Sequence, residues 1–188
     1  MDAAIIQKIL DGDIQQFRYL IDHHKNAAFR VARSIVKSDL VAEDAVQDAF
    51  IKVFQHLRQY RKEASFSTWL YRIVLNEALR KSKQKKLVAD DLSSIDETGS
   101  EPAIEPEAIE HLHIEEQKEL INLILDKLKP NESLVLKLYY LDDLSMEEIV
   151  QVTDLSLANI KVLLHRARKS FARLYLQKTG KTITNETG

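Results

Sequence analysis

The sequence predicts an all-α protein made of two small helical bundles joined by a flexible acidic linker. Apolar residues recur at three- and four-residue steps in nearly every segment outside the centre of the chain, and no strand pattern of comparable quality competes. The charges divide the chain in the same way. Residues 1–86 hold 16 Lys and Arg against 10 Asp and Glu, residues 87–120 hold one against 11, and residues 121–188 hold ten against eight.

The first bundle is expected over residues 1–86 and contains four helical segments. Ile5–Leu10 and Ile14–Val36 show helical spacing and are separated by the turn residues 11–13. Two further stripes of apolar residues follow at residues 42–57 and 66–79. The segment 87–113 is rich in acids, Ser and Pro, which is typical of a linker. Its acidity fits either a solvated tether or a protein that handles nucleic acid.

The second bundle is expected over residues 114–176, followed by a polar tail at 177–188. A short helix begins at Ser145, since Ser145 and Glu148 have the spacing of a capping box. After a tight turn, Ser156 caps a longer helix whose apolar residues fall at steps of three and four from Leu157 to Leu174. A short helix, a turn and a longer helix with a basic outer face suit the major groove of DNA. The alternative is a helical hairpin with a solvated basic face.

A second candidate surface for nucleic acid combines aromatic and basic residues between Arg58 and Lys86. Flat rings stack on unpaired bases and cations follow the backbone, which is how single-stranded DNA is held. The loop Arg61–Ser65 has the polar character expected of a pocket for a flipped base. Phe66 and Trp69 share an apolar stripe and are expected to be at least partly buried, whereas Tyr60 and Tyr71 are expected to be freer. The alternative is that these rings belong to the core.

The helix over residues 42–57 also has an acidic face with one exposed isoleucine. Acids repel DNA, so this face fits a protein partner, or else it is only solvated. The face consists of Glu43, Asp44, Gln47, Asp48 and Ile51.

Several functional classes are excluded or disfavoured. The chain has no Cys, which removes thiolate nucleophiles, disulfides and Cys-ligated metals. It has no Gly-rich phosphate loop and no nucleophile–base signature, so an enzyme, a cofactor and a small-molecule substrate are not expected. His111 and His113 fall on different helix faces, so no metal site is expected there. The absence of a signal-like start and of a span of about 20 apolar residues predicts a cytoplasmic protein.

Three motifs resemble the extracytoplasmic-function (ECF) subfamily of bacterial RNA polymerase sigma factors. They are Ala42–Phe50 (AEDAVQDAF), Ala64–Ile73 (ASFSTWLYRI) with Asn76, and Leu164–Lys169 (LHRARK). The likeness covers about residues 5–86 and 115–175. It implies sigma region two for the first bundle and the helix-turn-helix of region four for the second.

The resemblance also implies a role for each surface. Glu43–Ile51 would dock on the beta-prime clamp of core RNA polymerase, and region four would sit on the beta flap. The −10 promoter element would be opened and its flipped base captured by Tyr60, Arg61, Lys62, Ser65, Phe66, Trp69, Tyr71, Arg72, Asn76 and Arg80. The −35 element would be read by Ser145, Ser156, Asn159, Lys161, Val162, His165, Arg166 and Lys169. An anti-sigma factor, which can hold such a protein at the inner membrane face, is the expected regulator.

The chain departs from the family in its helix-turn-helix. Asp154 stands where the family commonly has Gly in the turn, and Val162-Leu163 replaces a common Ser-Arg pair, so Val162 is expected to touch a thymine methyl. The remaining alternative is a free-standing helix-turn-helix regulator, which needs a dimer and a palindromic site but not the aromatic–basic segment around Trp69. A purely structural helical adaptor would leave two basic surfaces unexplained.

Overall fold

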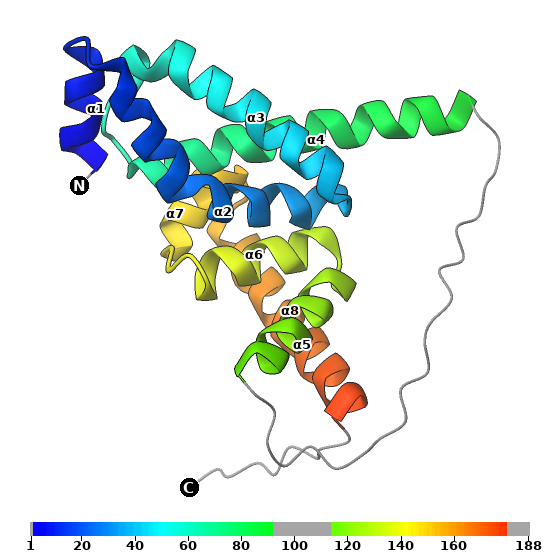
Figure 1. The fold of residues 1–188 in the computed structure, drawn as a ribbon. Helices are drawn as coiled ribbons and strands as arrows, with labels where there is room; N and C mark the ends of the chain where they lie inside the picture. Colours follow the sequence, from blue (N-terminus) through cyan, green and yellow to red (C-terminus); the bar gives the residue numbers. More distant parts are fainter. Residues whose placement is uncertain (1, 92–113, 180–188) are drawn as a thin grey trace, which may run out of the picture.

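A computed structural model describes residues 2–91 and 114–179, and every regular element in these ranges is a helix (Figure 1). The prediction of an all-α fold is confirmed. Residues 92–113, which include most of the predicted linker with His111 and His113, lie outside the described residues, as do residues 180–188. Within the two described ranges, no helix has both the length and the apolar character needed to cross a membrane.

The N-terminal unit packs its helices around fully buried aliphatic side chains such as Leu20, Val53 and Leu70. The predicted turn at residues 11–13 separates the first two helices. Lys37 ends the second in the left-handed conformation (φ 54°), and its N–H donates to the Arg33 carbonyl. The helices are α1 (Asp2–Leu10), α2 (Phe17–Val36), α3 (Asp39–His56) and α4 (Phe66–Asp91), with 3-10 turns η1 (Ile14–Gln16) and η2 (Leu57–Gln59).

The C-terminal unit contains α5 (Ile114–Lys127), α6 (Pro130–Tyr140), α7 (Met146–Thr153) and α8 (Leu157–Thr179). The predicted capping box is present, because the Glu148 amide donates to Ser145 Oγ and the Glu148 carboxylate accepts from the Ser145 amide. Ile149, Ile160 and Leu164 are buried and hold α7 against α8. The helix-turn-helix predicted from the spacing is therefore formed.

Asp154 occupies the tight turn of this motif in the left-handed conformation, with φ 57°. Gly adopts this conformation without cost, and Asp is among the few other residues that adopt it readily. The departure from the family's Gly is therefore compatible with the same turn.

The two units pack against each other. Helix α6 lies against α2 and α7 lies against α4 (Figure 1). Buried residues of both units form one continuous hydrophobic cluster. Helix α4 extends to Asp91, five residues into the predicted linker, and α8 extends to Thr179, three residues beyond the expected end of the second unit. The ends of the two units were predicted from composition, and composition does not reveal a helix that continues into polar residues.

Candidate nucleic-acid interface

A pocket of about 320 Å³ opens between the loop that precedes α4 and the first turns of that helix. It gathers five residues that the sequence assigned to −10 DNA, although they come from two stretches of the chain: Tyr60, Arg61, Lys62, Trp69 and Arg72. Gln59, Glu63, Ala64 and Thr68 complete its wall on the N-terminal unit, and Gln151 contributes from α7. The pocket thus combines an aromatic wall with three cations.

The aromatic wall is held by ring packing and one hydrogen bond. The rings of Tyr60 and Trp69 lie 5.2 Å apart at 33°, and Phe66 packs on both. The Tyr60 hydroxyl donates to the Ala64 carbonyl at 2.7 Å, and burial raises the pKa of this hydroxyl. Phe66 is buried and Trp69 is partly buried, as predicted. A partly exposed Trp leaves ring surface on which a base can stack.

The loop is ordered by its own hydroxyls. Ser65 Oγ accepts from the Thr68 amide at 3.2 Å and shares hydrogen bonds with the Ser67 and Thr68 hydroxyls. Lys62 has a left-handed backbone (φ 59°) at the tip of the loop. Ser65 therefore lies at the start of α4 and shapes the loop, but it does not line the pocket.

The position of Tyr71 differs from the sequence analysis, which expected it to be freer than Phe66 and Trp69. Only 4% of its surface is exposed. Burial raises the pKa of its hydroxyl strongly, and the negative charge of Asp142, on the C-terminal unit, raises it further. The apolar stripe of a single helix does not show which of its other side chains neighbouring segments will bury, and that is why the prediction was wrong.

Asn76 and Arg80 lie farther along α4, outside the pocket. Asn76 is exposed, and Arg80 forms ion pairs with Glu77 and Asp48, each at 2.9 Å. Lys81 binds Asp48 at 2.8 Å and also pairs with Asp44. The hydrogen bond from Lys81 is the main reason why the pKa of Asp48 is lowered. Two of the acids expected to face a protein partner are therefore already neutralised by α4.

The other three residues of the expected docking face line a groove of about 930 Å³ between α2 and α3: Glu43, Gln47 and Ile51. Its walls are largely aromatic and aliphatic, with Phe17, Ile21, Phe29, Val46, Phe50 and Phe54 among them. Ile51 is 55% exposed and Phe54 is 44% exposed. Sequence analysis placed Phe54 in the core stripe and missed the aromatic residues of α2, because the groove forms only when the two helices pair.

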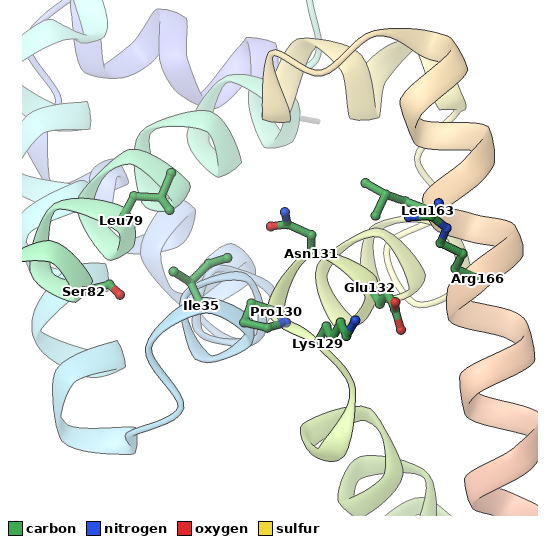
Figure 2. A pocket seen from close by; sticks show the side chains of 9 residues that line it. All are labelled: Ile35, Leu79, Ser82, Lys129, Pro130, Asn131, Glu132, Leu163 and Arg166. Carbon is green, nitrogen blue, oxygen red and sulfur yellow. The ribbon is translucent and has the colours of Figure 1, made fainter. Parts of the chain in front are cut away.

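The residues assigned to −35 DNA form an exposed face. All eight are exposed, and Val162 retains 47% of its accessible surface. Ser145 and Ser156 also cap helices, since Ser156 Oγ accepts from the Asn159 amide at 3.3 Å. Arg166 additionally lines a cavity of about 560 Å³ between the units, where α8 lies opposite Leu79 and Ser82 of α4 (Figure 2).

An apolar groove of about 290 Å³ on the C-terminal unit was not predicted. Helices α5, α6 and α8 form it, and the residues lining it are Ile121, Leu125, Leu136, Tyr140, Leu141, Arg168 and Phe171. Arg168 lies over the Tyr140 ring and donates to its hydroxyl at 2.8 Å. Helix α5, which follows the linker, forms part of this groove. The sequence analysis assigned no functional role to this helix.

Asp2, His23 and His24 bring potential metal-binding atoms within 4.8 Å of one another. The sequence analysis did not identify this group. His24 Nε2 and Asp2 Oδ2 lie 2.9 Å apart, so imidazole and carboxylate are hydrogen-bonded to each other and join α1 to α2. Burial lowers the pKa of His24, which favours the neutral ring.

A helix-turn-helix with an exposed basic face is typical of DNA-binding proteins, and the second unit adds an aromatic–cationic pocket. Two family models match these units: sigma-70 region 2 over residues 20–87 and sigma-70 region 4 over residues 118–171. The chain belongs to the sigma-70 family and, within it, to the ECF subfamily of RNA polymerase sigma factors.

Similar proteins agree with this membership. The ECF RNA polymerase sigma-E factor of Haemophilus influenzae is 26% identical, with 89% of this chain and 92% of that protein covered. The protein of the same name from Escherichia coli K12 is 27% identical, with 90% and 91% covered.

Two solved structures share the fold, each with a TM-score of 0.61 and 21% identity. One is CnrH in complex with the cytosolic domain of CnrY, which matches 91% of this chain and 94% of its own. The other is the sigma factor RpoE in complex with the anti-sigma factor NepR from Bartonella quintana, with 89% and 99% covered.

Proposed function

We propose that this ECF sigma factor binds core RNA polymerase, reads the −35 element with α8 and opens the −10 element with the pocket at the start of α4. The observation that carries the proposal is that one pocket collects Tyr60, Trp69 and three cations from separate stretches of the chain. In this view the protein has no catalytic step or cofactor of its own, acts in the cytoplasm and contributes only binding energy.

At the −10 element, a flipped non-template base stacks on the exposed part of Trp69 beside Tyr60. Stacking of one base on an aromatic side chain contributes about 1–3 kcal/mol, which offsets a large part of the cost of unpairing it. Arg61, Lys62 and Arg72 surround the same pocket and are suited to the phosphates on either side of the base. Asn76 and Arg80, farther along α4, contact the double-stranded DNA next to the −10 element.

Docking on the beta-prime clamp uses the groove between α2 and α3. Because Asp44 and Asp48 are paired with Lys81, the attraction comes mainly from the apolar part of the groove and from Glu43. Ile51 and Phe54 provide large exposed apolar surfaces at its rim. Burying such surfaces stabilises a complex by about 25 cal/mol per Å² before the costs of association.

At the −35 element, α8 enters the major groove. Lys161, Arg166 and Lys169 bind phosphates, while Val162 contacts a thymine methyl group. The apolar groove formed by α5, α6 and α8 is available for the beta flap of the polymerase.

An anti-sigma factor is the proposed regulator. Bartonella quintana RpoE, whose fold this chain shares, was solved with the anti-sigma factor NepR. In this chain, the exposed α2–α3 groove is a surface that such a partner and core polymerase would both require.

Co-elution with core RNA polymerase on size exclusion tests the docking role. Ile51→Arg is expected to abolish co-elution at micromolar concentration, because it places a charge in the apolar groove. The matched control is Leu40→Arg, the same change at a residue of α3 that is 77% exposed and does not line the groove. Equal binding of both variants and the parent would refute the docking surface. Failure of the parent itself to bind core would favour the free-standing regulator.

A further inference from the structure

Two adjacent histidines of α2 lie beside an acidic residue of α1. Potential metal-binding atoms of Asp2, His23 and His24 all lie within 4.8 Å of one another. The two helices are joined at this point by the hydrogen bond between His24 Nε2 and Asp2 Oδ2, at 2.9 Å. We call these three residues the α1–α2 cluster. None of them belongs to the surfaces proposed above for DNA or for core polymerase.

The donor atoms of the α1–α2 cluster suit a divalent transition metal. Imidazole nitrogens are preferred ligands of Zn²⁺, Ni²⁺ and Cu²⁺, and a carboxylate completes many such sites. Ca²⁺ and Mg²⁺ need a larger number of oxygen ligands, which one carboxylate does not provide. Three protein ligands leave one position of a tetrahedral ion for water, which distinguishes such a site from the closed, four-ligand sites that are purely structural.

The distances within the cluster need little adjustment to hold an ion. Ligand atoms bound to a tetrahedral zinc ion at about 2.0–2.1 Å lie roughly 3.3 Å from one another. The 2.9 Å between His24 Nε2 and Asp2 Oδ2 is close to this separation, and a shift of about 1.5 Å brings the most distant ligand atom within range. Coordination through Nε2 places the imidazole proton on Nδ1, so the hydrogen bond is exchanged for two metal–ligand bonds while the ring stays neutral.

Burial holds two of the ligands in place, and the third is open to solvent. The side chains of His24 and Asp2 are 8% and 24% exposed. His23 is exposed, and its ring stacks on that of Tyr19 with 5.9 Å between the centroids. The cluster therefore combines a fixed inner pair of ligands with an outer ligand that an ion can reach from solvent.

The cluster lies behind the aromatic wall of the pocket proposed for −10 DNA, which we call the −10 pocket. The ring of His24 packs on that of Phe66 at 5.2 Å, and Phe66 packs on Tyr60 and Trp69. The charge of the cluster also acts on this wall, because burial and then the negative charge of Asp2 raise the pKa of the Tyr60 hydroxyl. A divalent ion reverses the sign of the cluster's net charge, since only one of its three ligands is an anion. Positive potential beside the pocket favours a nucleic-acid strand.

We propose that Asp2, His23 and His24 bind a divalent transition-metal ion of the Zn²⁺ type, and that the bound ion strengthens the binding of single-stranded DNA in the adjacent −10 pocket. The second half of the proposal rests on the proposed function of that pocket, whereas the first half does not. The ion acts as an effector, because it contacts no base and supplies no chemical step.

Isothermal titration of ZnCl₂ into the full-length protein, treated with EDTA and dialysed, measures the binding. A single site is expected. His23→Ala is expected to weaken it by about tenfold or more, since even the loss of a group that only supports a ligand costs this much. Asp2→Asn, which keeps the size of the side chain and removes its charge, is expected to weaken it as well. The matched controls are His56→Ala, at an exposed histidine of α3, and the double variant His111→Ala/His113→Ala, and both should bind zinc as the parent does.

Thermal melts show whether the ion binds the folded chain. Zinc at about a hundred times its dissociation constant should raise the Tm of the parent by about 5–10 °C, because a ligand of the native state stabilises that state. The Tm of His23→Ala should rise much less. Because His23 is exposed, this variant is expected to melt as the parent does in EDTA.

A further arm measures affinity for a fluorescein-labelled single-stranded 20-mer of random sequence by anisotropy, in saturating zinc and in EDTA. Zinc is expected to tighten the binding of the parent by about fivefold or more. It should leave the affinity of His23→Ala nearly unchanged, which separates the effect of the site from contacts of free zinc with DNA. Trp69→Ala is included because it tests the −10 pocket without the ion.

The outcomes separate the two claims. Zinc binding that is absent, or equal in the parent, His23→Ala and Asp2→Asn, would overturn the site, and so would an unchanged Tm. Zinc binding without an effect on DNA affinity, while Trp69→Ala still weakens DNA binding, would overturn the coupling and support the metal site alone. An unchanged DNA affinity of Trp69→Ala in EDTA would overturn the assignment of the pocket to single-stranded DNA, and the zinc titration would still decide the metal site. Zinc binding and tighter DNA binding, both lost in His23→Ala, support the whole proposal.

Discussion

Glu77 links α4, which contributes to the −10 pocket, to α3, which forms one side of the α2–α3 groove. It is 3% exposed on α4, and its carboxylate accepts from Lys52 of α3 at 2.5 Å and from Arg80 at 2.9 Å. Burial alone would raise the pKa of this carboxyl, but the hydrogen bonds from Lys52 and Arg80 outweigh it and lower the pKa below 4.5. The substitution Glu77→Gln keeps the shape and removes the charge.

The expected loss of stability follows from the two charge-assisted hydrogen bonds. Each such bond contributes about 1.5–3 kcal/mol when fully buried. The side chains of Lys52 and Arg80 are 47% and 44% exposed, so in the variant hydrogen bonds to water compensate for part of the lost interaction with the carboxylate. Glu77→Gln is therefore expected to lower the free energy of unfolding by about 2 kcal/mol, a fall in Tm of about 4–8 °C for a chain of this size.

Urea denaturation followed by circular dichroism at pH 7 and at pH 3 provides the assay. A carboxyl whose pKa is lowered by folding contributes stability above its unfolded pKa and loses it as the pH falls through the folded value. The difference between parent and Glu77→Gln should thus be full at pH 7 and small at pH 3. Glu119→Gln, an exposed carboxylate of α5, should change stability by less than about 0.5 kcal/mol. An equal loss at both pH values, or none at pH 7, would refute the reasoning.

Three further substitutions test the remaining surfaces. Trp69→Ala should weaken open-complex formation by about 5- to 150-fold, the equivalent of one stacked base, and leave co-elution with core unchanged; a parallel loss of core binding would point to misfolding of α4. Val162→Ser removes the apolar contact with a thymine methyl and should shift the preferred −35 sequence in a promoter selection, whereas an unchanged preference would end that assignment. Asp154→Ala should destabilise the turn by about 1 kcal/mol more than Asp154→Gly in thermal melts, because φ is 57° there; equal melting temperatures would contradict the strain argument.

The helices and the helix-turn-helix could be predicted because their signals are local. Apolar spacing identified buried residues of α4 and α8 such as Leu70 and Leu164, although Leu79 and Leu157 of the same stripes are 41% and 37% exposed. The capping box at Ser145 located the N-cap of α7. Residues 61–64 of the loop suggested as a pocket for a flipped base do line a pocket of about 320 Å³, and its use for a base stays a prediction. These features depend on residues within a few turns of each other.

The errors concern contacts between distant segments. Tyr71 was expected to be freer than Phe66 and Trp69, but it is 4% exposed, and the charge of Asp142, 71 positions away in the chain, acts on its hydroxyl. The ion pairs of Asp48 with Arg80 and Lys81 of α4 were not foreseen, and the role of Asp48 in docking stays a prediction. The contact of Thr68 with Glu148 likewise joins residues 80 positions apart. Helical periodicity shows which residues are buried or exposed on one helix, but not which helix will lie beside it.

Transcription of genomic DNA by purified core polymerase, with and without the protein, tests the central claim most directly. The RNA 5′ ends are mapped by sequencing, so no promoter has to be known in advance. The account predicts a discrete set of new start sites that appear only with the protein, share two upstream elements and disappear with Ile51→Arg but not with Leu40→Arg. Identical 5′ ends with and without the protein would contradict the assignment as a promoter-selecting subunit.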